Sequence, residues 1–317
     1  MSRAKGVNSQ LALAYETAYG LTPASPTGYN MPFNQSKLSI NQNLINSTTI
    51  RGRRDQIQPA IGNTDVSGSI VVPIDQTGTG FWLRAMFGKP TTTGSGDPYT
   101  HVFKVANSQS SLVLEQQYPD IPAYEMFNGC KVNKFSFSYG GDNELTANIN
   151  ILGAKRTVGA APFASALTAL PVLKFSNFQG TIEEGGVQLA IVTEASLNAD
   201  FGLDGNTYTI GGNGCRTDLP EGTIQVFGSI KALFQDTVLL NKAVNNTQSS
   251  LKFKFTSGAH SLQFFMEEVI FQQTSPGIES EKGISINLPF KAFYESGAGG
   301  SAIVATLVNG YASYATA

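Results

Sequence analysis

A five-residue motif occurs twice in the chain and limits its architecture more than any other feature. Val66-Ser67-Gly68-Ser69-Ile70 recurs as Val226-Phe227-Gly228-Ser229-Ile230, 160 residues further on (226 minus 66). Two dipeptides recur in the same order, 150 residues apart: Phe103-Lys104 as Phe253-Lys254, and Ser111-Leu112 as Ser261-Leu262. Such self-similarity is typical of a duplicated unit. The repeat signature is formed by the identical positions Val66, Gly68, Ser69, Ile70, Val226, Gly228, Ser229 and Ile230.

Alternation of apolar and polar residues predicts that both halves are built from strands. Phe135, Phe137 and Tyr139 alternate with serines, and the residues from 145 to 151 alternate between apolar and polar ones. The turn residues 140–143 lie between these runs, so a hairpin is predicted. A similar run at 284–288 follows near the C-terminus. One dry and one wet face is typical of antiparallel sheets.

Each half also contains one short predicted helix, which follows the repeated motif in the sequence. Residues 81–87 are followed by Gly88 and Pro90, which end helices, and residues 238–244 follow the capping residue Asp236. Helices this short persist only when they are packed against other elements. The sequence therefore predicts a mainly β protein of two related halves, with one helix in each.

The halves are expected to be separate domains. We place the first domain at 1–153, a linker rich in Ala, Gly, Thr and Pro at 154–171, and the second domain, which ends in a C-terminal arm, at 172–317. The offset between the halves falls from 160 to 150 after the first match, and the polar segment Thr91–Thr100 has no counterpart in the second half. It is predicted to be an inserted surface loop.

Composition excludes several classes of protein. Charged residues make up 14% of the chain, against roughly 25% in ordinary globular proteins. The net charge of -2 gives no basic field that would hold nucleic acid tightly. The N-terminus lacks the apolar core of a signal peptide, and no apolar stretch is long enough to span a membrane. We therefore expect folding in the cytosol, with Cys130 and Cys215 as free thiols.

Residues that could carry catalysis or bind a metal are few and dispersed. His101 and His260 have no partner at metal-ligand spacing. No nucleophile elbow, zinc-protease helix or phosphate loop occurs. The adjacent carboxylates at 183–184 and 267–268 would point to opposite faces of a strand, so neither pair can act on one bond. The sequence predicts no enzyme, no cofactor and no metal.

The densest basic cluster lies in a long segment between two predicted strands. It consists of Arg51, Arg53 and Arg54, followed by Asp55. Nucleic-acid contact is one interpretation. In an acidic protein such arginines more often pair with carboxylates across an interface, because the planar guanidinium binds them in a bidentate way. The corresponding segment of the second half contains a single arginine, Arg216. The candidate interface residues are therefore Arg51, Arg53, Arg54, Asp55, Arg216 and Asp218.

Taken in order, these features resemble the tail tube proteins of siphophages. Residues 13–20 (LAYETAYG), followed by Thr22-Pro23, resemble the opening common in that family. The V-x-G-S-I strand, the short helix behind it and the late hairpin that starts at Gly129-Cys130-Lys131-Val132 are similar as well. The duplication departs from the single-domain members, which form hexameric rings, and resembles the subset with fused domains that form trimers.

The resemblance implies a structural virion protein made of two β-sandwiches, each with one flanking helix. Their inner sheets would form a shared barrel in a pseudo-hexameric, trimeric ring. Stacked rings would form a tube that conducts DNA into the host, with the protein assembled in the host cytoplasm. The implied partners are further copies of the chain, the tape measure protein inside the lumen, the terminator and the baseplate or distal tail proteins. DNA would be only a transient partner, and no membrane partner is expected.

The same resemblance implies where copies would meet. By analogy, the segments Ile45–Asp65 and Asp204–Gly222 would reach the adjacent ring, and the termini and Thr91–Thr100 are candidates for further contacts. The channel should be neutral or acidic, because a lumen lined with arginine would retain phosphates through counterion release.

Two other classes remain open. A carbohydrate-binding or adhesin-like β-sandwich would share the short strands and the low charge, but it predicts clustered exposed aromatics. The single tryptophan, Trp82, lies instead in a helical candidate beside Phe81 and Phe87. Another virion component, such as a terminator, baseplate or decoration protein, would be separated from a tube subunit by its copy number per particle.

Overall fold

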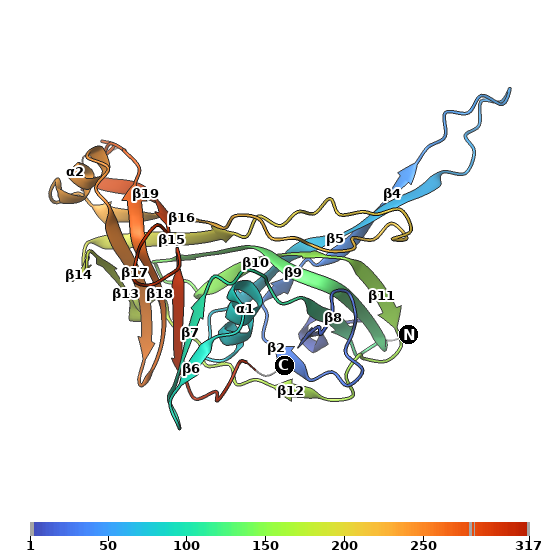
Figure 1. Ribbon diagram of the computed structural model, residues 1–317, viewed down its shortest axis with the longest axis horizontal. Helices are drawn as coiled ribbons and strands as arrows, with labels where there is room; N and C mark the ends of the chain where they lie inside the picture. Colours follow the sequence, from blue (N-terminus) through green and yellow to red (C-terminus); the bar gives the residue numbers. More distant parts are fainter. Residues whose placement is uncertain (1–2, 279–280, 282, 316–317) are drawn as a thin grey trace.

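The computed structural model describes residues 3–278, 281 and 283–315, and these residues form a mainly β protein (Figure 1). Two helices, α1 (Gly78–Phe87) and α2 (Val238–Val244), and two 3-10 turns, η1 (Gly6–Asn8) and η2 (Asn177–Gln179), complete it. The predicted fold class is confirmed. The strands are β1 (Gln10–Tyr15), β2 (Gly28–Met31), β3 (Gln35–Ser36), β4 (Ser39–Ile45), β5 (Ala60–Pro73), β6 (Thr91–Thr93), β7 (Tyr99–Lys104), β8 (Leu112–Tyr118), β9 (Ala123–Tyr139), β10 (Thr146–Gly153), β11 (Lys155–Gly159), β12 (Leu167–Ala169), β13 (Gly180–Glu184), β14 (Val187–Gln188), β15 (Val192–Asp200), β16 (Gln225–Leu233), β17 (Ser249–Ser257), β18 (His260–Phe271), β19 (Ser285–Phe293) and β20 (Val304–Asn309).

Six neighbouring strands have the same order in the two halves of the chain. In the first half the order is β4-β5-β10-β9-β8-β1, and every neighbouring pair is antiparallel. In the second half it is β15-β16-β19-β18-β17-β13, again antiparallel throughout. A helix follows β5 and β16, and a 3-10 turn precedes β1 and β13.

The pairing registers of the two halves agree as well. Ile40 lies opposite Val66 in the first half, and Ala199 lies opposite Val226 in the second. The register of β8 on β9 shifts just after Leu112, and that of β17 on β18 shifts just after Ser249. The repeated motif therefore occupies the same place in both halves.

The position of the motif in the sheet explains why both of its copies contain glycine. A Cβ atom at Gly68 would overlap the carbonyl oxygen of Lys37 on the neighbouring segment. A Cβ atom at Gly228 would overlap the carbonyl oxygen of Ser196, which holds the position equivalent to Lys37. At both sites the neighbouring backbone lies so close that only glycine, which has no Cβ atom, leaves room for it.

The two dipeptide matches at the offset of 150 are wrong. They align β7 with β17 and β8 with β18, whereas in the sheet β17 holds the place of β8, and β18 that of β9. The first half contains an additional hairpin, β6-β7, between α1 and β8. Thr91–Thr100 is thus not a plain surface loop, because β6 and the start of β7 lie within it.

The predicted linker pairs with strands of the first half, and a strand near the C-terminus joins the two halves. The segment 154–171, predicted as a linker, carries β11, which pairs with β9, and β12, which pairs in parallel with β2. Near the C-terminus β20 pairs with β18 of the second half on one edge and with β7 of the first half on the other.

The helices are packed to very different extents. Every residue of α1 is buried, including Phe81 and Trp82, whereas α2 buries only Leu239 and Ala243. The α1 helix begins three residues before the predicted start because Asp75 caps it: its Oδ1 accepts the N–H groups of Thr77 (2.8 Å) and Gly78. Burial raises the pKa of Asp75 to about 6. As predicted, α2 starts behind Asp236, whose Oδ1 accepts the Val238 N–H at 2.9 Å.

Candidate assembly surfaces

The two halves are joined by backbone pairing between β9 and β15. The last part of β9 pairs with β10 on one edge and with β15 on the other, where Lys134 lies opposite Asp200. The Phe201 N–H donates to the Asn133 carbonyl at 2.9 Å. Strands β4, β5, β10, β9, β15, β16 and β19 therefore form one continuous sheet that crosses from one half to the other (Figure 1).

The face of this sheet that points away from the core is polar, and most of its charges are paired. Lys134 pairs with Asp200 at 2.8 Å, and Lys231 with Glu194 at 3.3 Å. Lys291 of β19, opposite Phe227, is exposed on the same face. Two hollows lie on this face, and serine and asparagine make up much of their lining. Those that lie on strands of this sheet are Ser136, Ser138, Asn148, Asn150, Ser196, Asn198, Ser229 and Asn287.

The outer edge of β4 has no strand partner among the described residues. β15, which holds the equivalent place, is covered by β9 on that edge. The Lys37 N–H donates to the Ser69 carbonyl at 2.8 Å, so in the alternating antiparallel pattern the N–H of Ile40 points away from β5. An unpaired strand edge is a template for another strand. The sequence pattern did not reveal this edge.

At the other end of the sheet, the segment that follows β18 is also unpaired. The Gln272 N–H still donates to the Pro289 carbonyl at 2.8 Å, but residues 273–278 pair with no strand in the described part of the chain. The equivalent residues of β9 are those that pair with β15. Each end of the chain's continuous sheet thus offers one free edge.

Strands β4 and β5 extend beyond the sheet as a finger, which we define as residues 44–61 (Figure 1). The predicted loop from Ile45 to Asp65 is shorter than expected, since β5 already begins at Ala60. Arg53 pairs with Asp55 at 3.0 Å, and both side chains are about two-thirds exposed. Exposed apolar residues, which the sequence analysis missed, accompany the arginines: Leu44, Ile45, Ile50, Ile57 and Ile61.

The segment 204–222 behaves differently from the finger, because it folds back onto the first half. The Thr64 N–H donates to the Gly214 carbonyl at 2.8 Å, and the Tyr208 hydroxyl donates to the Thr64 carbonyl at 3.0 Å. Arg216 was expected to contact a neighbouring copy, but its side chain is buried within the chain. Its guanidinium donates to the carbonyls of Gly205 (2.7 Å), Val66 (3.1 Å) and Gly153 (2.9 Å), and pairs with Asp65.

Asp218 is also engaged within the chain, although more loosely. Its Oδ1 lies 3.7 Å from the Nζ of Lys131, and its side chain is 56% exposed. Lys131 itself is buried and binds Glu221 at 2.9 Å and the Leu219 carbonyl at 2.8 Å. Of the candidate interface residues, only Arg51, Arg53, Arg54 and Asp55 lie on the exposed finger, and their contact with a neighbour stays a prediction.

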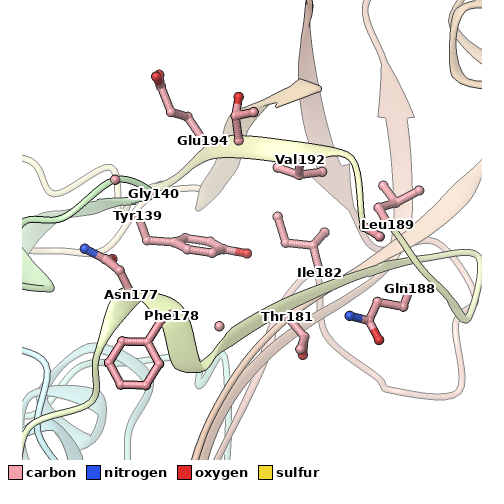
Figure 2. A pocket seen from close by; sticks show the side chains of 14 residues that line it. Tyr139, Gly140, Asn177, Phe178, Thr181, Ile182, Gln188, Leu189, Val192 and Glu194 are labelled. Carbon is pink, nitrogen blue, oxygen red and sulfur yellow. The ribbon is translucent and has the colours of Figure 1, made fainter. Parts of the chain in front are cut away.

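The groups that could support chemistry are dispersed. Figure 2 shows a hollow where η2 and β13 approach the end of β9, with the Tyr139 ring pointing into it and Glu194 pointing away. Burial raises the pKa of Tyr139. The neighbouring carboxylates Glu183 and Glu184 bind different lysines, Lys252 and Lys242, each at 2.5 Å. Within the described residues no cluster of His, Cys, Asp and Glu could hold a metal ion.

The histidines and cysteines have structural surroundings. His101 is buried against the Tyr311 carbonyl at 2.8 Å, and burial lowers its pKa. His260 lies 2.9 Å from Asp97. Cys130 and Cys215 are both free thiols. No helix in the described ranges is long and apolar enough to cross a membrane.

Comparisons with known proteins identify the family. The family model described as phage tail tube protein matches residues 6–292. A comparison with curated protein sequences gives no match. The family match covers nearly the whole continuous sheet, both helices and the finger. The chain therefore belongs to the phage tail tube protein family.

Proposed function

We propose that this protein forms the tail tube of a siphophage as stacked rings of three chains that conduct DNA. Membership of the family makes it a structural component of the virion tail. The observation that carries the ring proposal is the junction between β9 and β15. The β9-β15 junction would be the contact between two successive units of the ring, and the two equivalent edges have no strand partner among the described residues.

The two units would be domains that arose by duplication, at 1–153 and 172–317. Equal strand order, equal register and the same glycine contact in both halves support this. The resemblance to hexameric rings of single-domain members then favours three chains, since three pairs of domains give six units. A closed ring leaves no unpaired sheet edge, which is the physical advantage of closure.

The internal junction indicates how two chains would pair. Within the chain Lys134 lies opposite Asp200. The residue equivalent to Asp200 is Asn41, which follows Ile40 as Asp200 follows Ala199. Phe271 is equivalent to Val132, because each lies opposite an equivalent residue, Phe290 or Ile151. Two residues further along, Gln273 is therefore equivalent to Lys134. Between two copies, Gln273 of one copy would then lie opposite Asn41 of the next.

The finger would connect one ring to the next. Electron microscopy of the purified protein is expected to show tubes whose rings contain three copies.

Replacing Arg51, Arg53 and Arg54 by Glu reverses three exposed charges and is expected to leave single rings, because contacts between charged groups depend on complementary sign. Lys155→Glu, a single charge reversal outside the finger, serves as the control. Tubes of normal length from the triple variant would end the proposal for the finger.

The polar face of the continuous sheet would line the lumen. Asp200→Asn together with Glu194→Gln would leave Lys134 and Lys231 unpaired and remove two negative charges per chain. We expect DNA release from particles that carry this variant to slow at low salt and to recover at about 0.5 M salt, where charges are screened. The control, Lys134→Gln with Lys231→Gln, should not slow release. Equal release times at low salt would contradict the assignment of this face to the lumen.

A further inference from the structure

The link between the repeated strand and the helix is covered in the first half and uncovered in the second. The links start alike: the Ile74 N–H donates to the Leu145 carbonyl, and the Phe234 N–H to the Ile284 carbonyl, both at 3.0 Å. Residues 74–77 are all buried. In the second half, Phe234 is half-buried and residues 235–237 are exposed. The same backbone thus has two different surroundings.

A segment of the second half covers the first link. Residues 173–175, just before η2, run antiparallel to it, with Lys174 opposite Asp75. The Gln76 N–H donates to the Leu173 carbonyl at 2.8 Å, and the Phe175 N–H donates to the Ile74 carbonyl at 3.0 Å. This strap reaches across the junction between the halves.

The second link lacks such a strap. Among the described residues, neither the Phe234 carbonyl nor the Asp236 N–H has a hydrogen-bond partner, although these groups correspond to the bonded Ile74 carbonyl and Gln76 N–H. Leu233 and Val238, on either side, are 44% and 57% exposed. Polar backbone groups beside exposed apolar side chains favour coverage by an added segment.

The chain contains a second segment at the place of the strap. η1 precedes β1 as η2 precedes β13, and each turn has three residues. Matching the turns makes Arg3 equivalent to Lys174, so both straps carry a basic residue at this point, and Ala4 equivalent to Phe175. Arg3 and Lys5 are exposed. In one chain the N-terminal end and α2 lie on opposite sides of the molecule, so this segment cannot reach its own second link (Figure 1).

We propose that residues 3–5 of one copy form an antiparallel bridge with residues 234–236 of the neighbouring copy, Arg3 lying opposite Gln235. This inference rests on the proposed ring, in which the first half of the next copy stands beside the second half as the second half stands beside the first. Ala4 then donates its N–H to the Phe234 carbonyl, and the strap covers the Asp236 N–H, as the first strap covers that of Gln76. The N-terminal segment becomes a strap between copies.

Disulfide trapping tests this contact. The template pair, Asp75 and Lys174, lies between its two hydrogen bonds, and such non-hydrogen-bonded pairs have Cα atoms about 4.5 Å apart, within the range that a disulfide spans. We expect Arg3→Cys with Gln235→Cys, in a Cys215→Ser background, to give linked dimers and trimers on oxidation of assembled rings. Each variant that carries only one of the two introduced cysteines should remain monomeric on a denaturing gel, since Cys130 is buried.

A second pair separates this inference from the ring itself. Asn41→Cys with Gln273→Cys should crosslink wherever the proposed sheet junction forms. Crosslinking at 41 and 273 without crosslinking at 3 and 235 would overturn the strap and leave the ring standing. Absence of both crosslinks in rings seen by microscopy would overturn both. If the cysteines prevent assembly, hydrogen exchange of the wild-type protein decides: the Asp236 amide should exchange at least tenfold more slowly in rings than in monomers, and an unchanged rate would overturn the strap.

Discussion

Replacing Ile40 by proline is expected to give a folded monomer that no longer closes into rings. The Ile40 N–H points away from β5 and is not part of the internal ladder, so the monomer loses no strand-to-strand bond. Proline is tolerated at such an edge. In the ring this N–H would pair with the segment after β18 of the preceding copy. Its loss costs about 1 kcal/mol at each junction, and every ring contains three junctions.

The effect should be visible by light scattering coupled to size exclusion, with circular dichroism to show that the fold is intact. Ile40→Ala keeps the N–H and should still form rings. Asn41→Pro is the contrasting variant, because the Asn41 N–H points toward β5. It should lower the thermal stability of the monomer itself. Rings of normal size from Ile40→Pro would show that β4 does not form the contact between copies.

The local parts of the fold could be predicted from the sequence. Alternation located the β9-β10 hairpin, and Gly88 and Asp236 marked one end of each helix. The repeated motif indicated the duplicated strands β5 and β16, and the close approach at Gly68 and Gly228 explains why both copies contain glycine. These features depend on residues within one or two neighbouring strands.

The long-range pairings could not be predicted in this way. The dipeptide matches failed because two residues carry too little information to align a strand, and the hairpin β6-β7 is stabilised by β20, some two hundred residues away in the chain. Arg216 was misjudged for the same reason. Its four acceptors lie in three segments that meet only in the folded chain, so its spacing in the sequence gave no sign of burial.

Arg216 also supports the second large prediction, which concerns stability. Arg216→Met keeps most of the aliphatic length of the side chain but removes all of its hydrogen-bond donors. The carbonyls of Val66 and Gly153 would then lose the guanidinium as a partner at a buried site, and each unsatisfied acceptor costs about 1–3 kcal/mol. We expect the free energy of unfolding to fall by roughly 3 kcal/mol. Urea denaturation of the monomer measures this loss.

Two control variants separate the contributions of Arg216. Asp65→Asn should cost under about 1 kcal/mol, because the Asp65 side chain is 46% exposed and water can replace its partner. Arg216→Lys should fall between the two, since one ammonium group cannot reach acceptors on three segments at once. In Arg216→Met the segment 204–222 should also become sensitive to limited proteolysis, as its main fastening is gone. Equal unfolding midpoints for Arg216→Met and the wild type would mean that Thr64 and Tyr208 hold this segment without the arginine.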